Sequence, residues 1–423
     1  MFLFFRKNFV AILLILILLV LLSYASNITS IPNSIILFQN EDFTVRTMAG
    51  IRLQEETKDQ SLAVPTSMQI GNNRVADDSN YENNEKSATK TYHLSFLGMN
   101  LKTITADVVE DRKVIPLGNI VGLKLYTQGI LVVGMNELQG EDNKIYKPYE
   151  EAGLQQGDNI IKANQEIIES TKDLIQCVSK NKGKTIKIVY LRDGKEKNTT
   201  ITPVKTGRNM YQLGLWVRDA AAGVGTLSFY DSKTNSIVSL GHGIQDIDTG
   251  EMVTISSGEF VTSRIVTIEK GKKDQPGRIE GNIENSKGVG TIYSNTPFGV
   301  YGHLENKNLL SNVPMQEIEV AKRSAIKEGE ASILCTLENG KVEEYKVKIQ
   351  KVFQNNNKNN KSMIVKVIDE RLLEKTGGII QGMSGSPILQ NGKLIGALTH
   401  VLVSDPTTGY GVFADLMLAG VKS

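Results

Sequence analysis

The residues best suited to covalent chemistry lie in the run Gly382-Met383-Ser384-Gly385-Ser386-Pro387. A serine in a tight turn presents its hydroxyl, and the turn directs backbone N–H groups at one point, where they stabilise an oxyanion. The two glycines permit backbone angles that a Cβ disfavours. We therefore predict Ser384 as a nucleophile, with the amides of Gly382 and Ser384 as its oxyanion hole. The plain alternative is an ordinary Gly/Ser turn.

A weak hydroxyl nucleophile needs a base whose pKa lies near neutrality, and histidine is the usual one. The chain has four histidines. His242 follows the predicted strand 236–240 and is bracketed by glycines, so we predict it as the base. His303 is the alternative, whereas His400 follows the hairpin after Ser384 and comes too late in the chain.

A third group must accept a hydrogen bond from the base and fix its tautomer. Spacing alone leaves four carboxylates open for this role: Asp246, Asp248, Asp274 and Asp369. No spacing of cysteine and histidine indicates a zinc site, and the predicted chemistry needs no metal or cofactor.

The 423 residues predict two or three domains, and a net charge of +2 gives no indication of a nucleic-acid partner. Many short apolar runs punctuated by glycine predict a mainly β protein. The cysteines, Cys177 and Cys335, fall in different predicted domains, so we expect no disulfide.

Residues 1–25 form a predicted signal or anchor segment. Arg6 and Lys7 precede an apolar run from Phe9 to Leu22. The basic flank is expected to stay inside and the rest of the chain to be exported. Residues 26–90 are predicted to be a partly disordered linker, because most of them are polar and lack periodicity.

Residues 91–203 are predicted to be a PDZ domain with preceding strands. The stretches AGLQQGDNIIKANQEII, from residue 152, and LRDGKE, from residue 191, resemble bacterial PDZ domains of exported proteases. In that family a peptide adds a strand to a sheet edge, and its carboxylate meets loop amides. The resemblance implies that the carboxylate loop and edge strand include Val121, Gly122, Leu123 and Lys124.

Residues 204–423 resemble the serine peptidases of the stage IV sporulation protein B family. The matching stretches are SLGHGI, from residue 239, and TGGIIQGMSGSPI, from residue 376. The resemblance implies a chymotrypsin-like double β-barrel with His242 as base and Ser384 as nucleophile. It also favours Asp369 as the acidic member.

The same resemblance implies a role in sporulation. The peptidase would be exported across, or anchored in, the forespore membrane, and would face the space between forespore and mother cell. There it would cleave itself, and then a membrane-bound regulator of an intramembrane metalloprotease that activates a late mother-cell sigma factor. Two alternatives are a broad quality-control PDZ protease and a non-enzymatic PDZ scaffold.

Overall fold

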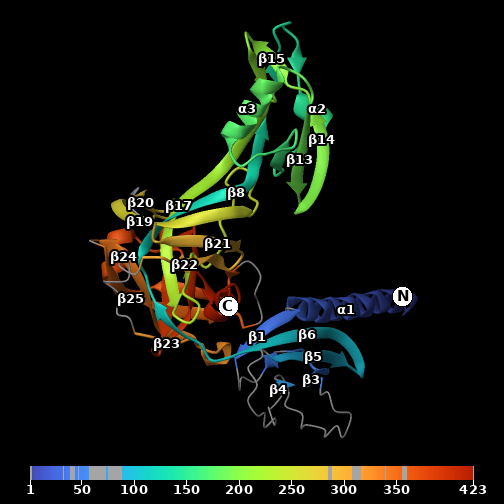
Figure 1. Cartoon of the computed structure of the whole chain (residues 1–423). Coiled ribbons are helices and arrows are strands. Elements are labelled where there is room, and N and C mark those ends of the chain that lie inside the picture. Colours follow the sequence, from blue (N-terminus) through green and yellow to red (C-terminus); the bar gives the residue numbers. More distant parts are fainter. Residues whose placement is uncertain are drawn as a thin grey trace.

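Strands build most of this chain in the computed structural model, which describes residues 2–31, 33–38, 43–45, 47–56, 73–74, 88–283, 288–306, 316–338, 340–354 and 360–422. Figure 1 shows an N-terminal helix beside a small sheet, a central body of curved sheets and a module that projects from this body on long strands. The predicted mainly β fold is confirmed.

The N-terminal part is a helix docked on a four-stranded sheet. Helix α1 spans Phe2–Ser30, and the sheet has the order β1-β6-β5-β3. Its strands are β1 (Ser34–Phe38), β3 (Ile51–Glu55), β5 (Ala88–Phe96) and β6 (Met99–Val109), with a further short pair of β2 (Thr44–Val45) and β4 (Asn73–Arg74). The sheet has its own apolar core. Part of the predicted linker thus forms a sheet, and its remainder lies mostly outside the described residues.

The first barrel is a ring of six strands in the order β8-β19-β21-β22-β18-β17, closed by pairing of β8 with β17. These strands are β8 (Ile120–Met135), β17 (Leu215–Asp231), β18 (Ser236–Ser239), β19 (Ile255–Glu269), β21 (Gly290–Thr296) and β22 (Gly299–Leu304). Strands β7 (Lys113–Pro116), β20 (Arg278–Ile283) and β23 (Ile318–Glu319) extend the sheet around it.

The projecting module is inserted between β8 and β17 and is built on the far halves of these two strands. It has two helices, α2 (Pro148–Ala152) and α3 (Thr171–Asn181). Its strands are β9 (Leu138–Gln139), β10 (Ile145–Tyr146), β11 (Asn159–Ala163), β12 (Glu166–Ile167), β13 (Ile186–Arg192), β14 (Lys195–Ile201), β15 (Val204–Gly207) and β16 (Met210–Gln212). As the capping-box pattern predicts, Ser170 caps α3 by accepting from the Asp173 N–H.

The second barrel is closed, in the order β24-β25-β26-β29-β28-β27. Its strands are β24 (Gly329–Glu338), β25 (Lys341–Val352), β26 (Met363–Val367), β27 (Pro387–Gln390), β28 (Lys393–Leu402) and β29 (Asp405–Phe413). The short helices are α4 (Glu370–Thr376), α5 (Ala414–Leu418) and a 3-10 turn, η2 (Arg323–Ala325). The predicted double barrel is therefore present, and its second half contains Ser384 while its first contains His242.

Candidate active site

Ser384 lies in a tight turn that leads into β27 of the second barrel. Gly382 and Gly385, on either side of it, have φ angles of +99° and +98°. These left-handed angles explain why the turn uses glycine. At Gly385 a Cβ would also lie 2.1 Å from the Thr226 carbonyl oxygen, so a side chain there would collide with the first barrel.

Two amides of this turn are free. Among the described residues, the N–H groups of Gly382 and Ser384 donate to no protein group. The other amides of the turn are bonded: those of Met383, Gly385 and Ser386 donate to Ile380, Leu398 and Met383 carbonyls. The free pair is the pair predicted from the sequence, and both amides belong to the turn that presents the Ser384 hydroxyl.

His242 follows β18 through a left-handed turn. Leu240 and Gly241 have φ angles of +68° and +67°. Its Nδ1 lies 2.8 Å from the Gly243 carbonyl oxygen. A carbonyl accepts only, so Nδ1 carries the proton and Nε2 is left as the basic nitrogen. Burial lowers the pKa of His242 below 6.5, so the ring is neutral at neutral pH.

Thr226, on β17, holds the serine turn against the first barrel. Its N–H donates to the Ser384 carbonyl at 3.0 Å, and its Oγ1 donates to the Gly382 carbonyl at 2.8 Å. Its own carbonyl accepts from the N–H of Leu240, two residues before His242. One buried residue thus contacts both turns, and the fold brings the predicted nucleophile and base to the same seam between the barrels.

His400 also reaches this seam, although it comes late in the chain. Its ring centroid lies 4.9 Å from that of His242. Desolvation and the neighbouring His242 ring lower the pKa of His400 to about 4, so it too is neutral at neutral pH. Thr399 directly precedes His400, and its carbonyl accepts a hydrogen bond from the Ser384 hydroxyl at 2.7 Å. Nothing in the sequence marks His400, because its approach to His242 depends on how the two barrels meet.

Asp369, by contrast, is engaged elsewhere. It caps α4, and its carboxylate accepts from the backbone N–H of Lys346 and from the backbone and guanidinium of Arg371. The Arg371 hydrogen bonds hold the pKa of Asp369 at about 2. Within the described chain no hydrogen bond joins it to His242. The structure thus does not bring together the acid and base that the resemblance implies.

The other acidic candidates either pair with Arg218 or are exposed to solvent. Asp246 is buried, pairs with Arg218 and accepts from the N–H groups of Asp248 and Thr249. Asp248 shares the same guanidinium, and Asp274 is exposed. The group that bonds Nδ1 of His242 is a backbone carbonyl, which fixes the same tautomer as a carboxylate but adds no full charge.

We expect Asp369→Asn to act on stability rather than on the chemical step. The charged carboxylate contributes above its ordinary pKa of 3.8, and this contribution is lost as pH falls towards about 2. Because the Arg371 side chain is 59% exposed, solvent weakens the pair, and we expect a loss of about 1–2 kcal/mol in unfolding free energy at neutral pH. Urea unfolding measures this loss, and peptide-cleavage assays measure kcat.

Glu370→Gln is the matched control for Asp369→Asn, because Glu370 is its exposed neighbour on α4. We expect Glu370→Gln to leave both stability and kcat nearly unchanged. A drop in kcat of about 10⁴-fold for Asp369→Asn, the size seen when a triad acid is neutralised, would instead establish Asp369 as the orienting acid.

The remaining sequence candidates lie away from this seam. His303 is exposed on β22, with its ring 4.8 Å from that of Tyr293. Residues 121–124 pair with β17 on one side of β8 and with β19 on the other. An edge strand must have a free side, so Val121, Gly122, Leu123 and Lys124 do not form the edge of a peptide groove. They belong to the first barrel.

The inserted module has its free edge elsewhere, in the first residues of β17. Leu215 to Arg218 pair with β8 on one side, and among the described residues they pair with no strand on the other. Helix α3 lies along this open side, where the Thr171 N–H donates to Asp219 Oδ2 at 2.7 Å. Gly214, with φ +69°, turns the chain into this edge. The sequence signal that was missed is Leu213-Gly214-Leu215-Trp216.

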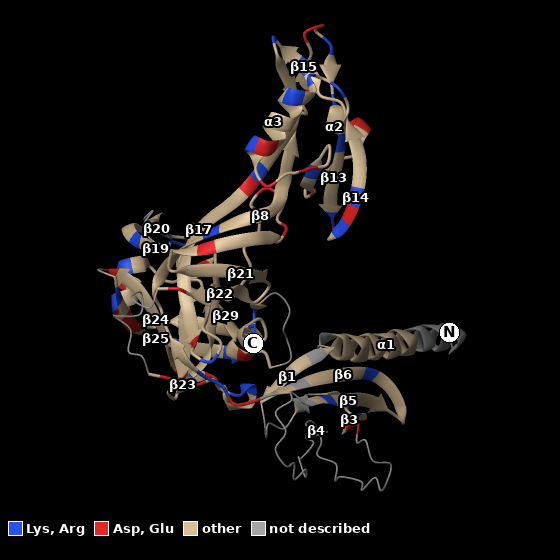
Figure 2. Ribbon diagram, in the orientation of Figure 1, with Lys and Arg blue, Asp and Glu red and all other residues tan. Residues whose placement is uncertain are grey.

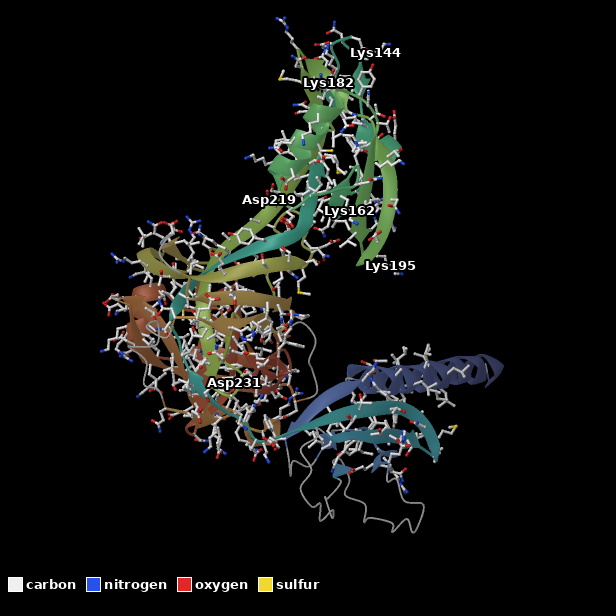
Figure 3. All side chains as sticks on the ribbon, viewed as in Figure 1. Lys144, Lys162, Lys182, Lys195, Asp219 and Asp231 are labelled. Atoms are coloured by element: carbon white, nitrogen blue, oxygen red, sulfur yellow. The ribbon has the colours of Figure 1, made fainter. Side chains whose placement is uncertain are left out.

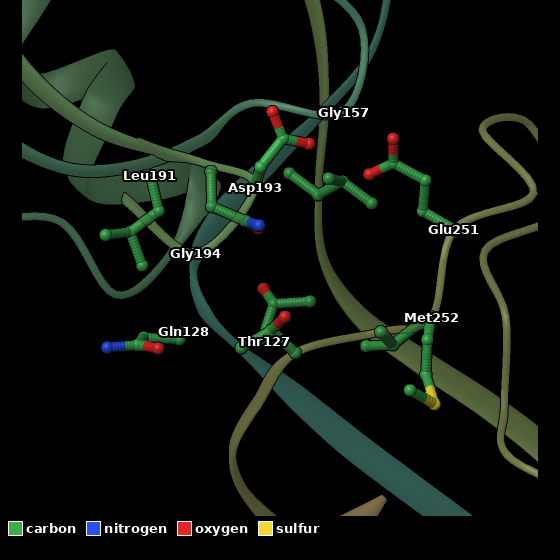
Figure 4. Close-up of a pocket in the computed structure, with 12 residues that line it drawn as sticks. Thr127, Gln128, Gly157, Leu191, Asp193, Gly194, Glu251 and Met252 are labelled. Carbon is green, nitrogen blue, oxygen red and sulfur yellow. The ribbon is translucent and has the colours of Figure 1, made fainter. Parts of the chain in front are cut away.

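A cavity of about 300 Å³ lies where the inserted module meets the first barrel (Figure 4). Gly157 and Asp193 line it from the module, and Glu251 and Met252 line it from the loop that follows His242. Ser384 is not part of its lining. The loop is tied to the module by a hydrogen bond of 2.8 Å from Gln156 Nε2 to the Asp248 carbonyl.

Comparison with known proteins gives the same two-part organisation. Residues 209–418 match the family described as SpoIVB peptidase S55, and residues 137–202 match the PDZ domain family. Among solved structures, the chain is similar to the PDZ domain of an SdrC-like protein from Listeria monocytogenes. The two are 21% identical with a TM-score of 0.17, and the match covers 21% of this chain and 87% of that one.

Proposed function

We propose that Ser384 is the nucleophile and His242 the general base of this chain. The chain belongs to the SpoIVB peptidase S55 family and carries a PDZ domain, which supports a sporulation serine peptidase. The observation that carries this proposal is the pair of unbonded N–H groups, of Gly382 and Ser384, in the turn that Thr226 holds beside the His242 turn.

The reaction follows from these positions. In the resting state the Ser384 hydroxyl donates to the Thr399 carbonyl. Rotation about the Cα–Cβ bond turns the hydroxyl to Nε2 of His242, which takes its proton as Ser384 Oγ attacks the peptide carbonyl. The two free amides bind the resulting oxyanion, and the Gly243 carbonyl accepts from Nδ1–H of the imidazolium. The protonated His242 then gives its proton to the leaving amine, and water resolves the acyl-enzyme.

We expect Thr226→Val to lower kcat by about 10- to 100-fold with little change in KM. Valine fills the same buried space but lacks the hydroxyl that bonds the Gly382 carbonyl, so the oxyanion turn loses an anchor. Because Thr226 is buried, the change alters no surface that a substrate contacts. Steady-state kinetics on an unstructured peptide measures the change. Thr226→Ser keeps the hydroxyl and should retain most activity, and equal losses in both variants would contradict this role.

The biological substrates we propose are those that the family resemblance implies: the chain itself, and then a membrane-bound regulator of an intramembrane metalloprotease whose release activates a late mother-cell sigma factor. The apolar helix α1 includes a stretch, Ile12–Thr29, apolar enough to cross a membrane or to serve as a signal sequence. Either role would bring the chain to a membrane, and we propose that it acts at the forespore membrane, facing the space between forespore and mother cell.

We also propose that the PDZ domain binds peptide C-termini between α3 and the free edge of β17. A bound peptide would add a strand to Leu215–Arg218, with its carboxylate at the Gly214 turn. Figure 3 labels Asp219 near this groove and Asp231 at the opposite end of the same strand. Thr226 lies between them, so one continuous strand joins the peptide groove to the serine turn. Through this strand, peptide binding would regulate self-cleavage.

Ile175→Glu tests this groove. Ile175 is an apolar residue of α3 that is 60% exposed, and we expect its replacement to weaken binding of a peptide with an apolar C-terminal residue about tenfold. Fluorescence polarisation of a labelled hexapeptide, compared with its C-terminal amide, measures the affinity. Ile167→Glu on β12 is the control, because Ile167 is equally apolar and 66% exposed but lies away from the groove. Equal binding by both variants, or equal affinity for the amide, would argue against the site.

Two experiments separate the proposed activity from its alternatives. An active-site fluorophosphonate should label Ser384 in the wild type; absence of labelling, together with stable intact mass over time, would favour a non-enzymatic PDZ scaffold. Incubation with unfolded casein distinguishes the other alternative, because a quality-control protease degrades it broadly, whereas a signalling peptidase cuts few sites in it.

A further inference from the structure

The turn between β5 and β6 exposes a cluster of apolar side chains. Leu97 is 82% exposed, Met99 61% and Leu101 40%. Leu97 and Gly98 both have positive φ angles, +49° and +82°, which is the geometry of a tight hairpin turn in which asparagine and glycine are favoured. An exposed leucine with a positive φ angle buries little apolar surface within the chain. The tip, Leu97 to Leu101, is therefore an exposed apolar surface.

The tip lies beside the end of the apolar helix. The rings of Tyr24 on α1 and Phe96 are 6.0 Å apart, edge to face. Further along the same strand pair, Lys102 Nζ donates to the carbonyls of Ile28 and Ile31. As the hairpin runs from Lys102 towards its tip, the neighbouring helix therefore runs back from Ile28 towards Tyr24 (Figure 1).

The helix is fixed in this position rather than simply tethered. Tyr24 and Ile28 pack against the core of the small sheet. The Tyr24 hydroxyl donates to the Ala49 carbonyl at 2.7 Å, and the Ser23 hydroxyl lies 3.7 Å from the Met48 sulfur. A helix docked at its C-terminal end sets the height of the hairpin relative to any bilayer that the helix crosses.

The tip itself carries no charged residue, and across the sheet the exposed Arg52 on β3 pairs with Ser95 next to it. Neither the turn 47–50 nor the segment 95–101 contains an ionisable residue. The nearest basic side chain along the hairpin, Lys102, is bonded to the end of α1. Figure 2 shows the hairpin tip and the described part of α1 in tan, with charged residues further back along the strands.

We propose that the β5–β6 tip inserts into the bilayer interface beside α1, as a second contact between the exported part of the chain and the lipid. Tyrosine is enriched at membrane interfaces, and Tyr24 lies two residues after Leu22, where the apolar run ends, so it marks the level of the interface on the helix. Phe96 contacts Tyr24 at this level, and Leu97 and Met99 follow Phe96 in the hairpin. Their side chains would move from water into the boundary between lipid headgroups and acyl chains. The small sheet then holds the peptidase at a set orientation to the membrane. This inference is independent of the catalytic assignment.

The test uses the full chain in lipid nanodiscs, with Leu97→Cys labelled by an environment-sensitive NBD fluorophore. The two native cysteines are buried, so the label reports position 97. Ile167→Cys in the PDZ domain is the matched control, because it is also apolar and exposed. We expect position 97 to emit at shorter wavelength than position 167, and to lose intensity when lipids carrying a shallow doxyl quencher are included.

Each outcome decides the proposal. Equal wavelength and equal quenching at both positions would show that the tip stays in water and would overturn it. A shift to shorter wavelength without doxyl quenching would show that another protein surface covers the tip, and would also overturn it. Doxyl quenching at position 97 that disappears in Leu97→Cys chains carrying Met99→Glu would support insertion through the apolar side chains.

Discussion

Ser384→Ala is expected to lower kcat for peptide hydrolysis by about 10⁶-fold, because it removes the only atom that we propose to attack the scissile bond. The same change should leave the fold intact. The Ser384 hydroxyl is half-buried and makes one hydrogen bond, to Thr399, so its removal should cost at most about 1 kcal/mol of unfolding free energy.

The chain offers a close control for this change. Ser386 lies in the same turn, and its buried Oγ has no hydrogen-bond partner in the described structure. We expect Ser386→Ala to retain near-normal activity. Intact mass of the purified full chains over time should show fragments in the wild type and in Ser386→Ala, and none in Ser384→Ala. Fragments of the same masses from Ser384→Ala would mean that the nucleophile is another residue.

Local sequence patterns predicted the serine turn well because its requirements are local. Glycines that must adopt positive φ angles, a following hairpin and an unbonded amide pair all arise within a few residues of Ser384. The same holds for His242, which closes a short strand pair of the first barrel. The family resemblance implied that His242 and Ser384 act together, and in the structure Thr226 contacts both turns.

The features that were missed depend on long-range topology. The stretch from Val121 to Lys124 has the local pattern of an ordinary strand. Nothing in that pattern shows that it belongs to a barrel whose next strand in the chain begins after the inserted PDZ domain. The free edge at Leu215 is recognisable only once that insertion is known. His400 reaches His242 because two barrels meet, which no spacing in the sequence records.

Asp369 shows what a family resemblance cannot predict about a single residue. A resemblance can place a residue type at a position, but its role depends on what else is near. Here Arg371 and the Lys346 amide use the carboxylate as a cap of α4, while the Gly243 carbonyl meets the base. A Ser–His pair oriented by a backbone carbonyl lacks the carboxylate charge that stabilises an imidazolium. Slow turnover would suit the signalling peptidase that we propose, which would cut few bonds.

His242→Ala should lower kcat about as far as Ser384→Ala, and the double variant should lose little more than either single one, because the two residues act as a unit. His303→Ala is the control: it removes an exposed ring on the same barrel that contacts Tyr293, away from the serine turn, and should keep full activity. Additive losses in the double variant would show that His242 does not serve Ser384.

The pH profile tests the base directly. His242 must be neutral to accept a proton, so kcat/KM should fall as pH drops through its pKa. Burial lowers that pKa below 6.5, and the acid limb should therefore have its midpoint below 6.5 rather than at it. His400 already has a pKa of about 4 and stays neutral over most of this range, so His400→Phe should keep the limb where it is. The opposite result would be an acid limb that moves or vanishes in His400→Phe but persists, at reduced rate, in His242→Ala. It would show that His400 is the base.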